Sequence, residues 1–196
     1  MPTTHLLYLH GFRSSPESIK AQKVAQRVAL QHPGVVWWCP QLAISPAQAA
    51  VQIAQDTAGW PAATMAVVGS SLGGFYASWL AARRGCKAVL LNPAVHPARD
   101  LAKYIGEQTA WHNPQERFFF QPAFVDELKT LEADTPPHPE PGHVLAIVAK
   151  GDEVLDWREM AARHASARLQ LLEGSDHALS DFDALVDGVF DFLRLA

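Results

Sequence analysis

Six short, almost wholly apolar runs recur along this 196-residue chain. They occupy residues 6–9, 35–38, 65–68, 88–91, 144–149 and 169–172. Runs of this length are typical of strands, whereas buried helices are longer. A strand that is apolar at every position has both faces covered, as in parallel sheets with helices on both sides. The runs therefore predict a mostly parallel six-stranded sheet.

The longer segments between these runs are amphipathic and carry signals for helix ends. Ser15-Pro16 and Ser45-Pro46 each join an N-cap residue to a proline in the first turn. Gly85 is placed to terminate a helix. We expect helices over about 15–31, 45–59, 72–84, 156–164 and 181–195. Alternation of strands and helices predicts right-handed βαβ units and a three-layer α/β fold with helices on both faces of the sheet.

One segment, at about 97–142, breaks this alternation. It contains a run of three phenylalanines at 118–120 and four prolines between 136 and 141. We expect two short helices within it, at about 97–105 and 122–131. A long insertion between strands is usually a lid or a binding surface; the alternative is a helical excursion that packs on the sheet. We expect residues 1–196 to form a single domain with this lid-like insertion.

The pentapeptide Gly69-Ser70-Ser71-Leu72-Gly73 matches the G-x-S-x-G nucleophile elbow. It follows a predicted strand and opens a predicted helix, as that motif requires. In such an elbow the serine lies on a strained turn, and side chains at the two glycine positions would collide with the neighbouring strand and helix. Only Ser71 has the correct register, because Val68 stands where Ser70 would need a glycine. Ser71 is therefore the predicted nucleophile.

A serine nucleophile needs a base, and the base needs an acid that orients it. Asp152 follows the run at 144–149, and His177 follows the run at 169–172. Both positions lie at the carboxyl ends of predicted parallel strands, the same sheet edge as the elbow. We therefore predict His177 as the base and Asp152 as the acid. Glu153 and Asp156 are alternatives for the acid, although Asp156 also suits a helix N-cap.

Backbone N–H groups and nearby side chains complete the predicted site. The N–H of Leu72, which opens the helix, and that of Phe12, after the first strand, are expected to stabilise an oxyanion. Arg13 would recognise an anionic substrate or be solvated. The aromatic residues of the insertion would line an acyl pocket or serve the core. The candidate substrate-binding residues are His10, Arg13, Trp111 and Phe119.

Composition excludes several classes of function. Lys and Arg total 16 and Asp and Glu total 20, for a net charge of -4, and the longest basic run is Arg83–Arg84. A nucleic-acid partner is not expected, because proteins that bind nucleic acids carry a basic surface.

No apolar run approaches the ~18 residues of a membrane span, and no secretory signal is evident. Cys39 and Cys86 fit no metal spacing. We expect two buried, reduced thiols and a cytoplasmic protein.

Taken together, the motifs resemble the small bacterial YqiA/YcfP-type esterases of the α/β-hydrolase fold. The likeness covers nearly the whole chain and rests on residues 8–16, 68–77, 92–95, 150–156 and 174–178. It implies a Ser71–Asp152–His177 triad and hydrolysis of carboxylic esters or thioesters without a cofactor or metal. The six runs suit a minimal sheet of this fold, with the strands in the spatial order 2-1-3-4-5-6.

The expected function is that of a serine esterase. Ser71 would attack an acyl carbonyl and form an acyl-enzyme, with His177 as proton carrier. Its partner would be a small-molecule ester or thioester. The alternative within enzymes is an acyl-CoA thioesterase, because the same triad serves both reactions. From another class, the alternative is a non-catalytic binding protein on a hydrolase fold.

Overall fold

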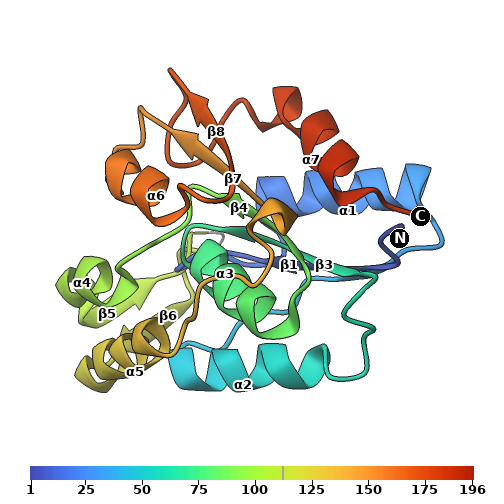
Figure 1. Ribbon diagram of the computed structural model, residues 1–196. Helices are drawn as coiled ribbons and strands as arrows, with labels where there is room; N and C mark the ends of the chain where they lie inside the picture. The colour runs from blue at the N-terminus through green and yellow to red at the C-terminus, as the bar shows by residue number, and fades with distance from the viewer. Residues whose placement is uncertain (112) are drawn as a thin grey trace.

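A six-stranded parallel sheet forms the centre of the molecule (Figure 1). The computed structural model describes residues 1–111 and 113–196. Every strand pairing in this sheet is parallel, and the order is β2-β1-β3-β4-β7-β8, which confirms the predicted order. The strands are β1 (His5–Leu9), β2 (Val36–Trp38), β3 (Met65–Ser70), β4 (Lys87–Leu91), β7 (Val144–Ala149) and β8 (Arg168–Leu172).

Helices cover both faces of the sheet, as the uniformly apolar strands predict. Helices α1 (Ile19–Gln31) and α7 (Val186–Leu193) lie on one face (Figure 1). Helices α2 (Pro46–Asp56), α3 (Leu72–Arg84) and α6 (Trp157–Arg163) lie on the other. Alternate strand residues belong to the two resulting cores: Leu6 packs with α1 and α7, and Leu7 packs with α2 and α3. The predicted three-layer α/β architecture is confirmed.

Helix ends differ from the predicted ones at two places. Helix α1 begins at Ile19 rather than near Ser15, because the buried Ser15 side chain accepts a hydrogen bond from the Glu17 N–H and makes a turn there instead. The predicted helix over 181–195 is divided into a short 3-10 turn, η3 (Phe182–Ala184), and α7. In contrast, Ser45 caps α2 as expected, by accepting from the Gln48 N–H.

The insertion after β4 contains both predicted helices and a hairpin that was not predicted. Its elements are α4 (Pro97–Leu101), η1 (Ala102–Tyr104), β5 (Gly106–Thr109), β6 (Arg117–Phe120), α5 (Pro122–Ala133) and η2 (Pro141–His143). Strands β5 and β6 form an antiparallel pair separate from the main sheet. Sequence analysis misses the hairpin because β5 is short and carries three polar residues in a row, Glu107, Gln108 and Thr109. Figure 1 shows α4, β5, β6 and α5 grouped at one end of the molecule.

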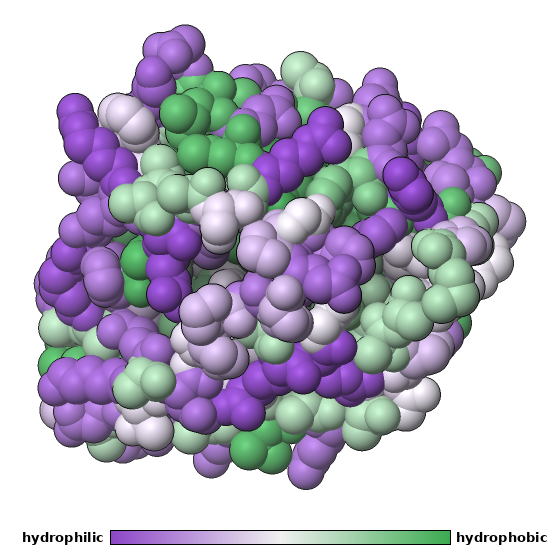
Figure 2. All heavy atoms as spheres, viewed as in Figure 1, coloured by the Kyte–Doolittle hydropathy of each residue, from purple (hydrophilic) through white to green (hydrophobic). Residues whose placement is uncertain are grey.

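Hydrophilic residues cover most of the face shown in Figure 2, with small hydrophobic groups between them and a larger one over β8. Strand β8 lies at the edge of the sheet, and its Leu171 is accordingly 39% exposed. The opposite edge strand, β2, likewise exposes Val36 and Trp38. Across the described ranges 1–111 and 113–196, no helix has both the length and the apolar character needed to cross a membrane.

Candidate active site

Ser71 lies between the end of β3 and the start of α3, in a backbone conformation that residues other than glycine rarely adopt. Its φ is 56° and its ψ is -120°. The glycines on either side make this turn sterically feasible. A Cβ on Gly69 would lie 2.7 Å from the Ala77 Cβ, and a Cβ on Gly73 would lie 2.6 Å from the His10 carbonyl oxygen. The strand, the helix and the neighbouring loop can therefore approach this closely only where glycine is present.

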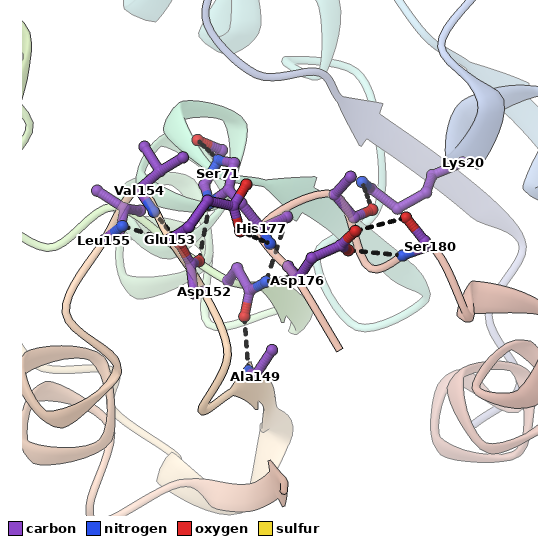
Figure 3. Close-up of polar contacts among 12 residues, drawn as sticks. Lys20, Ser71, Ala149, Asp152, Glu153, Val154, Leu155, Asp176, His177 and Ser180 are labelled. Atoms are coloured by element: carbon purple, nitrogen blue, oxygen red, sulfur yellow. Dashed lines mark hydrogen bonds and ion pairs between the residues drawn. The ribbon is translucent and has the colours of Figure 1, made fainter. Parts of the chain in front are cut away.

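Three side chains from separate loops form a hydrogen-bonded line at the carboxyl edge of the sheet (Figure 3). The Ser71 Oγ lies 3.0 Å from the His177 Nε2, and the His177 Nδ1 lies 2.7 Å from the Asp152 Oδ2. The Asp152 side chain is fully buried, whereas the His177 side chain is 20% exposed. An imidazole held by a buried carboxylate and directed at a hydroxyl can take a proton from that hydroxyl.

The Asp152 carboxylate is held from both sides. Its Oδ1 accepts hydrogen bonds of 2.8 Å from the N–H groups of Val154 and Leu155, and its Oδ2 faces the His177 ring. These bonds hold the carboxylate with its Oδ2 toward the imidazole. Gly151 allows the loop to pass the histidine loop closely, since a Cβ there would collide with the Ser175 carbonyl oxygen.

The two alternative acids occupy different places. Glu153 accepts a hydrogen bond of 3.0 Å from the backbone N–H of His177, so it contacts the histidine but not its ring (Figure 3). Asp156 caps α6 by accepting from the Arg158 N–H. Among the three acids predicted from the sequence, the structure places only Asp152 against the imidazole.

Asn92, at the end of β4, connects the acid and histidine loops and was not predicted as a site residue. It is fully buried and has a φ of 41°. Its side-chain oxygen accepts from the Ala149 N–H at 2.8 Å, and its amide nitrogen donates to the carbonyls of Asp176 and His177. A polar residue directly after an apolar strand was the available signal. The side chain fixes the spacing between the ends of two strands.

The histidine loop is also held from the opposite side. The Asp176 carboxylate accepts from the Ser180 N–H and hydroxyl, and these bonds, the hydroxyl first, lower the pKa of Asp176. Lys20, on α1, donates to the carbonyl oxygen of Ala178 (Figure 3). Burial lowers the pKa of the Lys20 ammonium, and the nearby Asp176 acts in the opposite direction. His177 thus projects from a loop with fixed ends.

The loop after β1 lies against the serine. A Cβ on Gly11 would be 3.3 Å from the Ser71 Cβ and 3.8 Å from its Oγ, so the Gly11–Phe12 backbone is adjacent to the nucleophile candidate. Leu72 is the first residue of α3, and its N–H is one of those that a helix leaves without an internal partner. The positive end of the helix dipole faces the same point. This arrangement suits a developing negative charge.

A cavity of about 120 Å³ opens beside Ser71 and His177. We call it the cleft. Its walls come from the β1 loop, the α3 start, the insertion and the acid loop, and they include Phe12, Arg13, Leu101, Tyr104, Trp111 and Leu155. The cleft is largely apolar, which suits an acyl chain. Trp111 stands at its rim and is 71% exposed.

Two predicted substrate-binding residues lie elsewhere. His10 is buried and lines a neighbouring cavity; its Nε2 accepts from the Leu42 N–H, and its Nδ1 donates to the Gly11 carbonyl. The ring therefore supports the β1 loop. Phe119 is 59% exposed and does not line the cleft. Alternation along β6 turns Phe118 and Phe120 toward the Phe12 ring, at centroid distances of 5.9 and 5.2 Å, and Phe119 away from it.

Within the described part of the chain, no group of three or more His, Cys, Asp or Glu side chains is placed to hold a metal ion.

Solved structures resemble this chain over nearly its whole length. A putative hydrolase from Agrobacterium vitis S4 has a TM-score of 0.76 at 16% identity, over 98% of this chain and 91% of that one. Est1E from Butyrivibrio proteoclasticus, solved with ferulic acid bound, has a TM-score of 0.75 at 17% identity, over 98% and 88% of the two chains. Alpha/beta hydrolase domain-containing protein 10 from mouse has a TM-score of 0.70 at 17% identity, over 97% and 91%.

At these identities the likeness shows the fold, which is that of the α/β hydrolases. The sequence carries the relationship further, since one family model extends from β1 to the end of α7. That model matches residues 5–194, so the resemblance to the YqiA/YcfP type is confirmed and the chain belongs to the uncharacterised protein family UPF0227.

Proposed function

We propose that the protein is a serine hydrolase that cleaves carboxylic esters through an acyl-enzyme. The observation that carries the proposal is the continuous hydrogen-bonded line from Ser71 through His177 to Asp152, with spacings of 3.0 and 2.7 Å. Est1E, which has a similar fold, binds ferulic acid, a small organic molecule. That supports a small-molecule substrate here.

In the proposed reaction, the Ser71 Oγ forms a bond to the acyl carbon while its proton passes to the His177 Nε2. Asp152 keeps the Nδ1 proton in place and stabilises the imidazolium that results. The carbonyl oxygen becomes an oxyanion beside the N–H groups of Leu72 and Phe12. One such donor typically contributes about 10²–10³ in turnover.

Collapse of the tetrahedral intermediate breaks the bond to the leaving alcohol, which takes the proton from the His177 Nε2. Water then attacks the acyl-enzyme, with His177 taking its proton, and the acid product leaves with Ser71 restored. His177 passes the serine proton to the leaving alcohol and a water proton back to Ser71. The proposed cycle involves only these proton transfers and acyl transfer, so it uses no cofactor. A thioester would follow the same steps with a thiol as leaving group.

We further propose that this chemistry operates in one domain, residues 1–196, whose insertion at 97–142 forms one wall of the cleft. The insertion supplies Leu101, Tyr104 and Trp111 to that wall.

We also propose a cytoplasmic location, because both cysteines are free thiols. Burial raises the pKa of Cys39 and Cys86 to about 12, which keeps both thiols protonated and unreactive. Cys86 is buried, but Cys39 is only partly so, which differs from the expectation of two buried thiols.

The proposal is tested with a fluorophosphonate probe, p-nitrophenyl esters of two to eight acyl carbons and the matching thioesters. We expect wild-type protein to be labelled and to turn over esters, and Ser71→Ala to lose labelling and about 10⁴-fold or more of the turnover. Ser70→Ala is the matched control, because Ser70 is the adjacent buried serine and lies outside the line. Equal turnover by Ser71→Ala would contradict the proposal. Folded wild-type protein that neither labels nor reacts would favour a binding protein.

A further inference from the structure

We infer that the ester hydrolysed at this site carries an anionic group, a carboxylate or a phosphate, and that the Arg13 guanidinium binds it at the mouth of the cleft. The inference rests on the proposed function and names a substrate class for the same site. Arg13 and the reacting pair, Ser71 and His177, line one cavity. A substrate bound beside the serine therefore occupies a cavity that Arg13 also lines.

The Arg13 side chain is held in place before any substrate arrives. Its Nε donates to the Thr109 carbonyl oxygen at 2.6 Å, and its guanidinium carbon lies 4.1 Å from the centroid of the Trp111 ring. The backbone N–H of Trp111 in turn donates to the backbone carbonyl of Arg13 at 2.7 Å. The backbone φ of Arg13 is 61°, in the left-handed region. A preplaced cation loses little conformational entropy when it binds an anion.

These contacts use the Nε and one face of the guanidinium. The two terminal Nη groups carry the remaining four N–H donors of an arginine. Among residues 1–111 and 113–196, none accepts a hydrogen bond from them or forms an ion pair with them. Two parallel N–H groups at this end of the side chain match the oxygens of a carboxylate or phosphate.

The cleft wall contains two cations, Arg13 and Lys103, and one carboxylate, Asp100, so positive charge is in excess there although the whole chain has a net charge of -4. Lys103 also lines the cleft, with its Nζ 5.2 Å from the Tyr104 ring centroid. Asp100 lines it too, but its Oδ1 is paired with Arg99 at 2.8 Å. Asp152 is buried against His177. Glu116, which lines the cavity next to the cleft, also has a partner.

A purely structural role for Arg13 explains less of this geometry. A tether to one carbonyl oxygen needs a single donor, which a lysine or glutamine supplies as well. The structure instead uses a planar cation and stacks it on an exposed tryptophan, in the wall of the cleft that also contains the serine. Stacking on an aromatic face leaves the in-plane donors available to a ligand.

The test compares kcat/KM for matched anionic and neutral esters. On the acyl side the pair is mono-p-nitrophenyl glutarate and p-nitrophenyl valerate. On the alcohol side it is 4-acetoxybenzoate and 4-acetoxybenzamide, with 4-acetoxyphenyl phosphate as the phosphate arm. We expect the wild type to prefer an anionic member of at least one set by about 10- to 100-fold, the effect of hydrogen bonds to a charged group. The preference should decline as NaCl is raised.

Arg13→Gln should abolish that preference, and Arg13→Lys should keep only part of it. The preference is the ratio of kcat/KM for the anionic ester to that for the neutral ester, measured within one variant. A general loss of activity from a loosened β5–β6 hairpin would lower both values and leave this ratio unchanged. Arg158→Gln is the matched control: Arg158 also stacks on a tryptophan, Trp157, at 4.8 Å, but does not line the cleft. It should keep the full preference.

Two outcomes would overturn the inference while leaving the proposed function intact. One is wild-type turnover that shows no anionic preference in any set. The other is a preference that survives unchanged in Arg13→Gln. By contrast, a wild-type protein that is inactive on every ester and unlabelled by fluorophosphonate would overturn the proposed function, and the inference with it.

Discussion

Replacing Asp152 with asparagine is expected to reduce kcat by about 10⁴-fold with little change in stability. In the wild type, the Asp152 Oδ1 accepts from two N–H groups, those of Val154 and Leu155. Only an oxygen can accept those bonds, so the new amide must keep its oxygen there and present its NH₂ group to the His177 Nδ1. The imidazole then has to accept at Nδ1 and carry its proton on Nε2. In that tautomer it cannot take the proton of Ser71.

The magnitude follows from this tautomer change. A factor of 10⁴ corresponds to about 5.5 kcal/mol of transition-state stabilisation. Stability should change much less, because the two backbone hydrogen bonds persist and the amide is nearly isosteric with the carboxylate. The assay measures kcat and KM with a p-nitrophenyl ester together with the thermal midpoint of each variant.

Glu153→Gln provides the matched control. Glu153 lies in the same turn and accepts from the His177 backbone N–H, a bond that the glutamine oxygen can still accept. We expect kcat within a few-fold of the wild type for this variant. If Asp152→Asn kept more than a tenth of the wild-type kcat, the tautomer argument would be refuted. If Glu153→Gln lost activity strongly while Asp152→Asn kept it, Glu153 would become the better candidate for the acid.

Two further predictions concern packing and pH. Gly73→Ala should lower the thermal midpoint and abolish turnover. The new Cβ would overlap the Leu9 carbonyl oxygen and lie 2.6 Å from the His10 carbonyl oxygen, which would displace the loop that carries Phe12. Wild-type stability and kcat in this variant would contradict the close approach. Burial first, and Arg163 second, lower the pKa of His164 from 6.5 to about 4. Because the unfolded state binds the proton more tightly, this group's contribution is present above pH 6.5 and is lost as pH falls toward 4, by about 2 kcal/mol at pH 5. His164→Gln should therefore lose less stability than the wild type between pH 7.5 and 5 in thermal melts, and identical losses would count against the buried neutral imidazole.

The site candidates that depend on local patterns could be predicted from the sequence. The elbow around Ser71 is such a pattern, because its glycines, strand and helix are contiguous. Asp152 and His177 could be placed at one sheet edge because each follows an apolar run, and the carboxyl ends of parallel strands share an edge. The structure brings these three side chains within hydrogen-bonding distance.

Contacts between segments far apart in the chain could not be predicted in this way. The Asn92 side chain forms hydrogen bonds with Ala149 and His177, which are 57 and 85 residues away in the sequence. The residues next to Asn92 in the sequence do not indicate these partners. The β5–β6 hairpin decides that Phe118 and Phe120 face Phe12 while Phe119 does not. Its strands are too short to show an alternating pattern along the sequence.

The amino-acid sequence alone determined the parallel sheet, its strand order and the chemistry available at its edge. The sheet and its chemistry follow from uniform hydrophobicity, helix-end residues and one glycine-flanked serine, all of which act over a few neighbouring positions. The strand order follows from the family resemblance that these motifs carry. The tertiary structure alone decided which acid faces the imidazole, what supports the histidine loop and where the Arg13 guanidinium lies. The physical reason is that rotamers and hydrogen-bond partners are set by packing between segments that are distant in the sequence. The sequence of each segment alone shows no pattern that identifies its packing partner.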